Sequence, residues 1–158
     1  MLNLGFYSGK NAPAVRLVPT RLDRMMELMA LLLLVAAWVL VLIPYFKGAI
    51  DTERWLTSMI LSTVMFAWVA WTGYMPVRLI KFPVRVHEGN IVIQYLYATR
   101  FGRVLNILLQ LCCVSSVFYF AGAYYGISYE TVKWIFLVVA VLFMVAMIVY
   151  YILAIHHR

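Results

Sequence analysis

Four long apolar runs occupy most of this chain of 158 residues, at positions 25–46, 55–75, 104–125 and 132–155. Each run has the roughly 20 residues that a helix needs to cross a hydrocarbon core about 30 Å thick. None of the runs has a charged residue at its centre, and none shows the alternation of a barrel strand. Because backbone polar groups must be satisfied inside lipid, such runs predict membrane-spanning helices.

The composition supports the same class of protein. Hydrophobic residues make up 66% of the chain, whereas soluble domains average about 45–50% apolar residues. A soluble domain of this size could not bury so much apolar surface, because small domains still expose a large share of theirs. The sequence therefore predicts an all-α integral membrane protein with four transmembrane helices, forming a single membrane domain over residues 1–158.

The positions of the basic residues predict how the helices are oriented. Cytoplasmic loops retain Lys and Arg, and ten of the 13 basic residues fall in the N-terminal segment, the 76–103 connection and the C-terminus: Lys10, Arg16, Arg21, Arg24, Arg78, Lys81, Arg85, Arg100, Arg103 and Arg158. The other three are Lys47, Arg54 and Lys133. We therefore expect both termini and the 76–103 loop to be cytoplasmic. The short connections 47–54 and 126–131 then predict two antiparallel helical hairpins.

The basic 76–103 loop is expected to meet lipid rather than nucleic acid. Basic residues that flank membrane spans usually contact anionic headgroups. The candidate headgroup contacts are Arg78, Lys81, Arg85, Arg100 and Arg103.

Two structures compete for the second half of this loop. Residues 82–87 alternate with strand period, so residues 84–87 and 91–95 could form a β-hairpin under the membrane, with Gly89-Asn90 as its turn. Alternatively, a helix begins at residues 87–90 and runs through Arg103 into the third span. Periodicity slightly favours the hairpin, because Ile91 and Val92 are β-branched.

A resemblance favours the helix. Residues 82–90, together with Gln94-Tyr95 and Ala98-Thr99-Arg100, resemble a segment of small bacterial membrane proteins. These proteins carry the domain of unknown function found at the N-terminus of SdpI-type toxin-immunity proteins, in which the segment precedes a membrane helix. The chain departs from the family in its shorter 43–48 loop and in ending after four spans, so it resembles a diverged member.

The resemblance implies a bacterial inner-membrane protein with an immunity-like or signalling role. It also implies that the 87–103 segment is a helix nearly continuous with the third span. We expect the lipid-facing edge of that helix to carry Ile91, Tyr95 and Leu96.

Enzymatic chemistry is not indicated. The chain has no paired carboxylates, zinc-protease motif or phosphate-binding glycine loop, so no catalytic residue, metal ligand or cofactor is predicted. The acidic residue nearest a span is Glu27, which we expect to pair with Arg24 or Lys81 at the membrane surface.

The third span carries one polar face. Arg103, Asn106, Gln110 and Cys113 follow helical spacing. Amides within spans tend to bond across helices, so we expect Asn106 and Gln110 to face Ser62, Thr63 or Thr72 of the second span. The alternative is a polar path for a substrate. Gly122 and Gly126 also form a GxxxG pair, which predicts either a close helix contact or the start of a loop.

Aromatic residues gather at the expected outer ends of the spans. Trp55 and Trp134 begin spans there, as membrane-interface residues do. A second group is either more of this aromatic belt or a surface for an extracytoplasmic peptide or another membrane protein: Tyr119, Tyr124, Tyr125 and Tyr129. The sequence thus predicts a non-enzymatic binding or regulatory membrane protein. The alternative is a subunit of a homo-oligomeric transporter or channel, with the Asn106–Gln110 face lining the path.

Overall fold

The computed structural model describes residues 18–50, 52–84, 86 and 89–157. Its long elements are α1 (Arg21–Phe46), α2 (Thr52–Thr72), α3 (Ile91–Tyr125) and α4 (Tyr129–His156), and a short 3-10 turn, η1 (Val77–Leu79), lies between α2 and α3. All four α-helices are long and apolar enough to cross a membrane. The prediction of an all-α chain with four such helices is confirmed.

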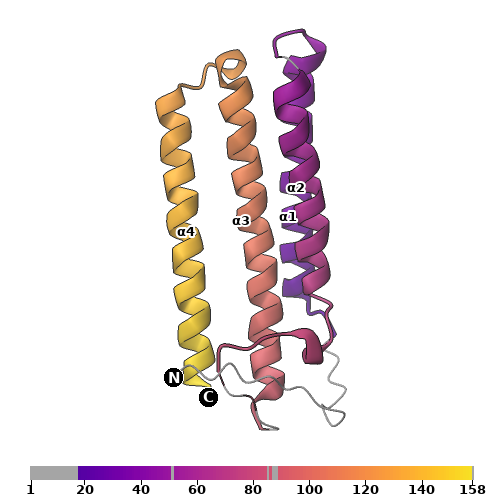
Figure 1. Cartoon of the computed structure of the whole chain (residues 1–158), viewed down its shortest axis with the longest axis vertical. Coiled ribbons are helices and arrows are strands. Elements are labelled where there is room, and N and C mark those ends of the chain that lie inside the picture. The colour runs from indigo at the N-terminus through magenta and orange to yellow at the C-terminus, as the bar shows by residue number, and fades with distance from the viewer. Residues whose placement is uncertain (1–17, 51, 85, 87–88, 158) are drawn as a thin grey trace.

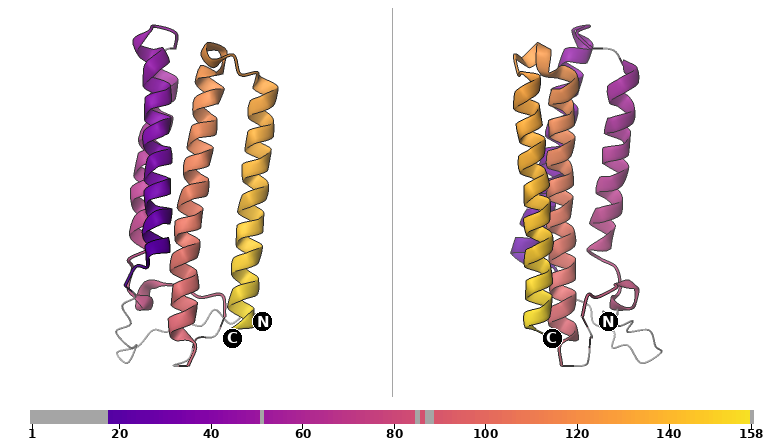
Figure 2. Two further views of the ribbon diagram at one scale, coloured as in Figure 1. Left: turned by 180° about the vertical axis from the view of Figure 1, so that it is seen from behind. Right: turned by 60° about the vertical axis from the view of Figure 1, so that its left-hand side comes forward.

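The four helices share one long axis, and α3 is central (Figures 1 and 2). Helix α3 packs against each of the other three, whereas α4 packs chiefly against α3. Helices α1 and α2 lie together on the other side of α3 (Figure 1). We call the end at which α1 and α3 begin and α2 and α4 finish the basic end, and the opposite end the tyrosine end.

Local chemistry sets where α1 begins. Thr20 and Asp23 form a capping box: Asp23 N–H donates to Thr20 Oγ1 at 3.3 Å, and Thr20 N–H donates to Asp23 Oδ2 at 2.8 Å. Such reciprocal bonds satisfy amide groups that have no partner within the helix. For this reason α1 starts at Arg21, ahead of the apolar run.

The end of α3 shows what the GxxxG pair does. Gly126 has a φ of +68°, in the left-handed region that glycine adopts most easily. Ile127 N–H then donates to Gly122 O at 2.9 Å, and a Cβ added at Gly122 would lie 3.0 Å from Ile127 O. Of the two predictions for this pair, the loop start is therefore the one found, since the glycines close the helix end.

The 91–103 segment is helical. A single helix runs from Ile91 to Tyr125, and no strand occurs in the described part of the chain. His87 and Glu88, where the helix was expected to begin, lie outside the described residues.

The expected lipid-facing edge of this segment is wrong for two of its residues. Ile91 and Tyr95 are buried, because the connection after α2 folds back and packs Val77 and Phe82 against them. The Tyr95 hydroxyl also donates to Met75 O at 2.8 Å. The start of α3 is thus covered by protein at its base.

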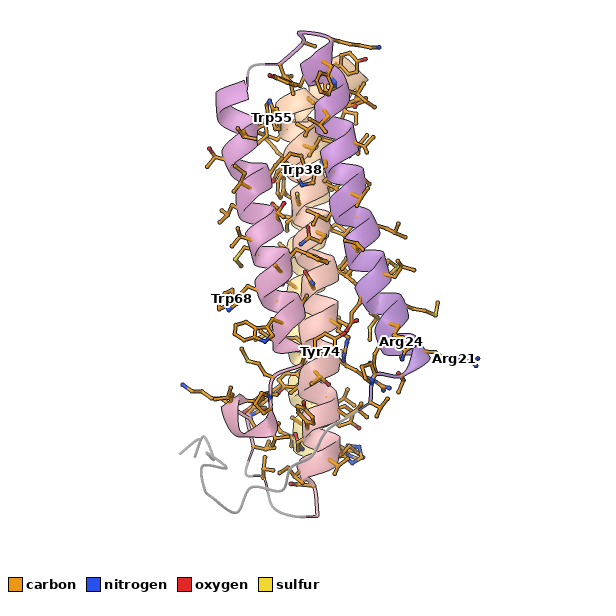
Figure 3. The ribbon with its side chains drawn as sticks, turned by 90° about the vertical axis from the view of Figure 1, so that its right-hand side faces the viewer. Arg21, Arg24, Trp38, Trp55, Trp68 and Tyr74 are labelled. Atoms are coloured by element: carbon orange, nitrogen blue, oxygen red, sulfur yellow. The ribbon has the colours of Figure 1, made fainter. Side chains whose placement is uncertain are left out.

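The apolar core lies between α1, α2 and α3, toward the tyrosine end. Figure 3 shows Trp38 and Trp55 between α1 and α2, whereas Trp68 points away from the helices. Trp55 is buried, so its predicted place in an interfacial belt is wrong. It packs edge-on against Trp38 with ring centroids 6.4 Å apart. By contrast, Trp134 is exposed.

Candidate functional site

Four charged side chains join α1 to α3 at the basic end. Arg103 Nε donates to Glu27 Oε1 at 2.8 Å, and Arg103 Nη1 lies 3.5 Å from Asp23 Oδ1. Arg100 Nε lies 3.3 Å from the same Asp23 oxygen. The two acids are four residues apart on α1 and the two arginines three apart on α3, so each pair occupies one face of its helix. We call these four residues the ionic cluster.

Two members of the ionic cluster are buried. The side chains of Arg103 and Asp23 are only 7% and 3% exposed. A charge in such a place is tolerated when it is paired and hydrogen-bonded. Arg103 therefore depends on its carboxylate partners, and α1 and α3 are held in one register.

Tyr74 adds the segment after α2 to this cluster. Its hydroxyl donates to Glu27 Oε2 at 2.6 Å, and the Arg103 guanidinium lies 5.8 Å from the centre of its ring. Figure 3 shows Tyr74 at this end of the molecule. The hydrogen bond to Glu27 raises the pKa of the Tyr74 phenol above its ordinary value, which favours the protonated hydroxyl that donates this bond.

These contacts correct two predictions. Glu27 pairs with Arg103 rather than with Arg24 or Lys81. Arg103 was expected to reach lipid headgroups, but it is buried beneath α1. Both errors have one origin: the acidic pair at the start of the first apolar run and the arginine pair at the start of the third are far apart in the sequence. Their matching helical spacing was the signal that could have joined them.

The other predicted headgroup contacts have varied surroundings. Arg100 is 33% exposed and shares Asp23 with Arg103. Lys81 is exposed. Arg85 and the side chain of Arg78 lie outside what the structure describes.

The predicted polar face of α3 continues inward from the ionic cluster. Asn106 and Gln110 are 3% and 1% exposed, and Arg103 and Cys113 are buried on the same face. Asn106 Nδ2 donates to Phe66 O of α2 at 3.4 Å, and Gln110 Nε2 donates to Asn106 Oδ1 at 3.4 Å. The prediction that both amides point into the protein is confirmed.

The expected partners of these amides were wrong. The hydroxyls of Thr63 and Thr72 donate instead to carbonyls of their own helix, Met59 O and Val69 O. Hydroxyl groups on helices commonly make such local bonds. The Asn106 amide therefore donates to a backbone carbonyl of α2 instead of to a hydroxyl. Within the described residues, Gln110 Oε1 and Trp55 Nε1 have no hydrogen-bond partner.

The tyrosine end carries an exposed aromatic surface. Tyr119 and Tyr129 are 55% and 57% exposed, with ring centroids 5.7 Å apart, and Tyr124 is also exposed. Two lysines lie over these rings: Lys133 Nζ is 4.7 Å from the Tyr129 centroid, and Lys47 Nζ is 5.6 Å from that of Tyr124. We call Tyr119, Tyr124 and Tyr129 the tyrosine surface.

Tyr125 is different from the other three tyrosines. It is half-buried, and its hydroxyl donates to Leu40 O of α1 at 2.6 Å. It therefore contributes to the packing of α3 on α1, which the sequence prediction of one four-tyrosine surface did not separate.

Comparison of the chain with protein-family models, with curated proteins and with solved structures found no match.

Proposed function

We propose that this protein is a non-enzymatic binding or regulatory protein of the bacterial inner membrane. The apolar outer faces of four membrane-length helices support the membrane placement. The partition of basic residues supports cytoplasmic termini and two antiparallel helical hairpins. In this orientation the basic end is cytoplasmic and the tyrosine end faces outward.

The exposed tyrosine surface is the single observation that carries the binding proposal. The charged and amide side chains of the buried α3 face bond within the protein, whereas Tyr119, Tyr124 and Tyr129 are exposed at one end. Tyrosine offers a large, rigid contact area with a polar tip at low entropic cost. Lys47 and Lys133 add positive charge beside the rings. The proposed partner is an extracytoplasmic peptide, or the outer segment of another membrane protein, bearing acidic and apolar groups.

A transporter or channel subunit is the second proposal. Its support is the buried face with the unpartnered oxygen of Gln110. Asn106 contacts α2 of the same chain, so a path along this face would run through one molecule rather than between copies. Loss of transport on combined Asn106→Leu and Gln110→Leu substitution would favour this proposal over partner binding.

Site-specific photocrosslinking tests the binding proposal. A benzophenone amino acid is placed at Tyr119 or Tyr129 in intact bacteria. The controls are the half-buried Tyr125 and the exposed Met144 in the middle of α4. We expect a discrete crosslinked product from positions 119 and 129 that protease added to spheroplasts removes. No product at these positions, or the same products at Met144, would refute a partner at the tyrosine surface.

A further inference from the structure

A lateral groove lies between α3 and α4 in the half of the molecule nearer the basic end. Its volume is about 230 Å³, and it is lined mainly by apolar and aromatic side chains. The residues that shape it are Arg100, Phe101, Val104, Ala146, Val149 and Tyr150. Because α4 packs chiefly against α3, no other helix of the described residues covers this flank (Figure 2).

The shape of the groove follows from a change in side-chain size along the two helices. Phe101 and Tyr150 stack face to face, with centroids 4.4 Å apart and planes 9° from parallel. One turn farther from the basic end, α4 has only the methyl group of Ala146. An apolar furrow therefore lies between the two helices and extends past the stacked pair to Val104 and Ala146.

Arg100 is the charged residue that lines this furrow. Its Nε contacts Asp23, but that carboxylate also neutralises Arg103 and receives two hydrogen bonds from Thr20. Within the described residues, no other group pairs with Arg100. A third of its side chain is exposed. The furrow therefore has one partly exposed arginine beside its apolar lining.

We propose that this groove binds one anionic phospholipid. The phosphate contacts the Arg100 guanidinium, and one acyl chain lies along Phe101, Val104 and Ala146. A cation beside an apolar furrow matches the two halves of an anionic lipid, and arginine is well suited to phosphate oxygens. The site rests on the proposed membrane placement and is independent of any partner at the tyrosine surface.

Native mass spectrometry of the purified protein tests the site, with phosphatidylglycerol and phosphatidylcholine added at equal concentration. Ala146→Phe fills the furrow, and the exposed Ala140 of the same helix provides the matched control as Ala140→Phe. Arg100→Gln removes the charge, and Arg24→Gln removes an exposed arginine at the same end as its control. Circular dichroism shows whether each variant is folded, and resistance to alkaline carbonate extraction reports membrane placement separately.

We expect the native protein to retain one phosphatidylglycerol in preference to phosphatidylcholine. Arg100→Gln should lower that preference about fivefold, the effect of losing one basic group near anionic lipid. Ala146→Phe should abolish retention of the bound lipid. Both control variants should behave as the native protein. The site is refuted if Ala146→Phe, folded and membrane-bound, retains as much phosphatidylglycerol as Ala140→Phe, or if Arg100→Gln and Arg24→Gln show equal preference.

Discussion

Arg103 and Glu27, separated by 76 residues in the sequence, form a 2.8 Å ion pair that joins α3 to α1. Glu27 uses its second oxygen to accept a hydrogen bond from Tyr74, just after α2. One carboxylate therefore contacts segments from two other parts of the chain. The pair lies at the basic end of the helices. It therefore fixes the position of α1 relative to α3 along their long axis.

Loss of the Arg103 charge should destabilise the protein. Removing one partner of a fully buried pair costs about 3–5 kcal/mol, and Glu27 is partly exposed, so we expect Arg103→Met to lower the free energy of unfolding by about 2–3 kcal/mol. Titration of the purified protein with SDS, followed by circular dichroism, measures this. Arg24→Met is the control, because Arg24 is exposed; its effect should stay within about 0.5 kcal/mol. Equal losses for the two variants would contradict the structural role of the ion pair.

The two buried amides should respond differently to substitution by leucine. Gln110→Leu removes an oxygen that has no partner in the described structure along with one weak bond, so we expect a change below about 0.6 kcal/mol, the average for hydrogen bonds between membrane helices. Asn106→Leu removes the bond to Phe66 O and leaves the Gln110 amide without its acceptor. It should cost about 1–2 kcal/mol. The same SDS titration compares them. If Gln110→Leu proves the more damaging variant, this account of the polar face is incorrect.

Gln94 should hold the last turn of α4 in place. Its Nε2 donates to Ala154 O at 2.9 Å and His157 O at 3.1 Å, and the last carbonyls of a helix need such partners from outside the helix. We expect Gln94→Leu to speed amide hydrogen exchange in the last turn of α4, with little change in α1. Exchange measured by mass spectrometry on peptides from both helices tests this. Thr99→Val is the control, since Thr99 bonds within its own helix, and faster exchange at α4 in that variant would point to general loosening of α3 instead.

The orientation predicts which connections react with an impermeant thiol reagent. In a background without Cys112 and Cys113, a cysteine at Ala49, in the turn after α1, should be labelled in spheroplasts. A cysteine at Leu79, in the connection after α2, should be labelled only after the membrane is opened. Both positions are exposed in the structure, and neither change removes a basic residue. The reverse pattern would overturn the positive-inside assignment.

The sequence by itself determined the class of the protein and its four helices. Hydrophobic length decides this, because an apolar run of about 20 residues must form a helix to satisfy its own backbone in lipid. The inward direction of Asn106 and Gln110 follows from the same reasoning, since amides that faced lipid would leave donors and acceptors unpaired. Helical spacing alone places them on one face with Arg103.

Tertiary structure alone decided which of these residues meet. Helical spacing shows that Asp23 and Glu27 share a face, and that Arg100 and Arg103 share another, but not that the two faces oppose one another at the same height. Likewise, periodicity left Ile91 and Tyr95 free to face lipid, and only the fold-back of Val77 and Phe82 covers them. Local sequence fixes the direction of a side chain on its own helix. The register and packing of separate helices arise from contacts between segments far apart in the chain, and no short stretch of sequence contains them.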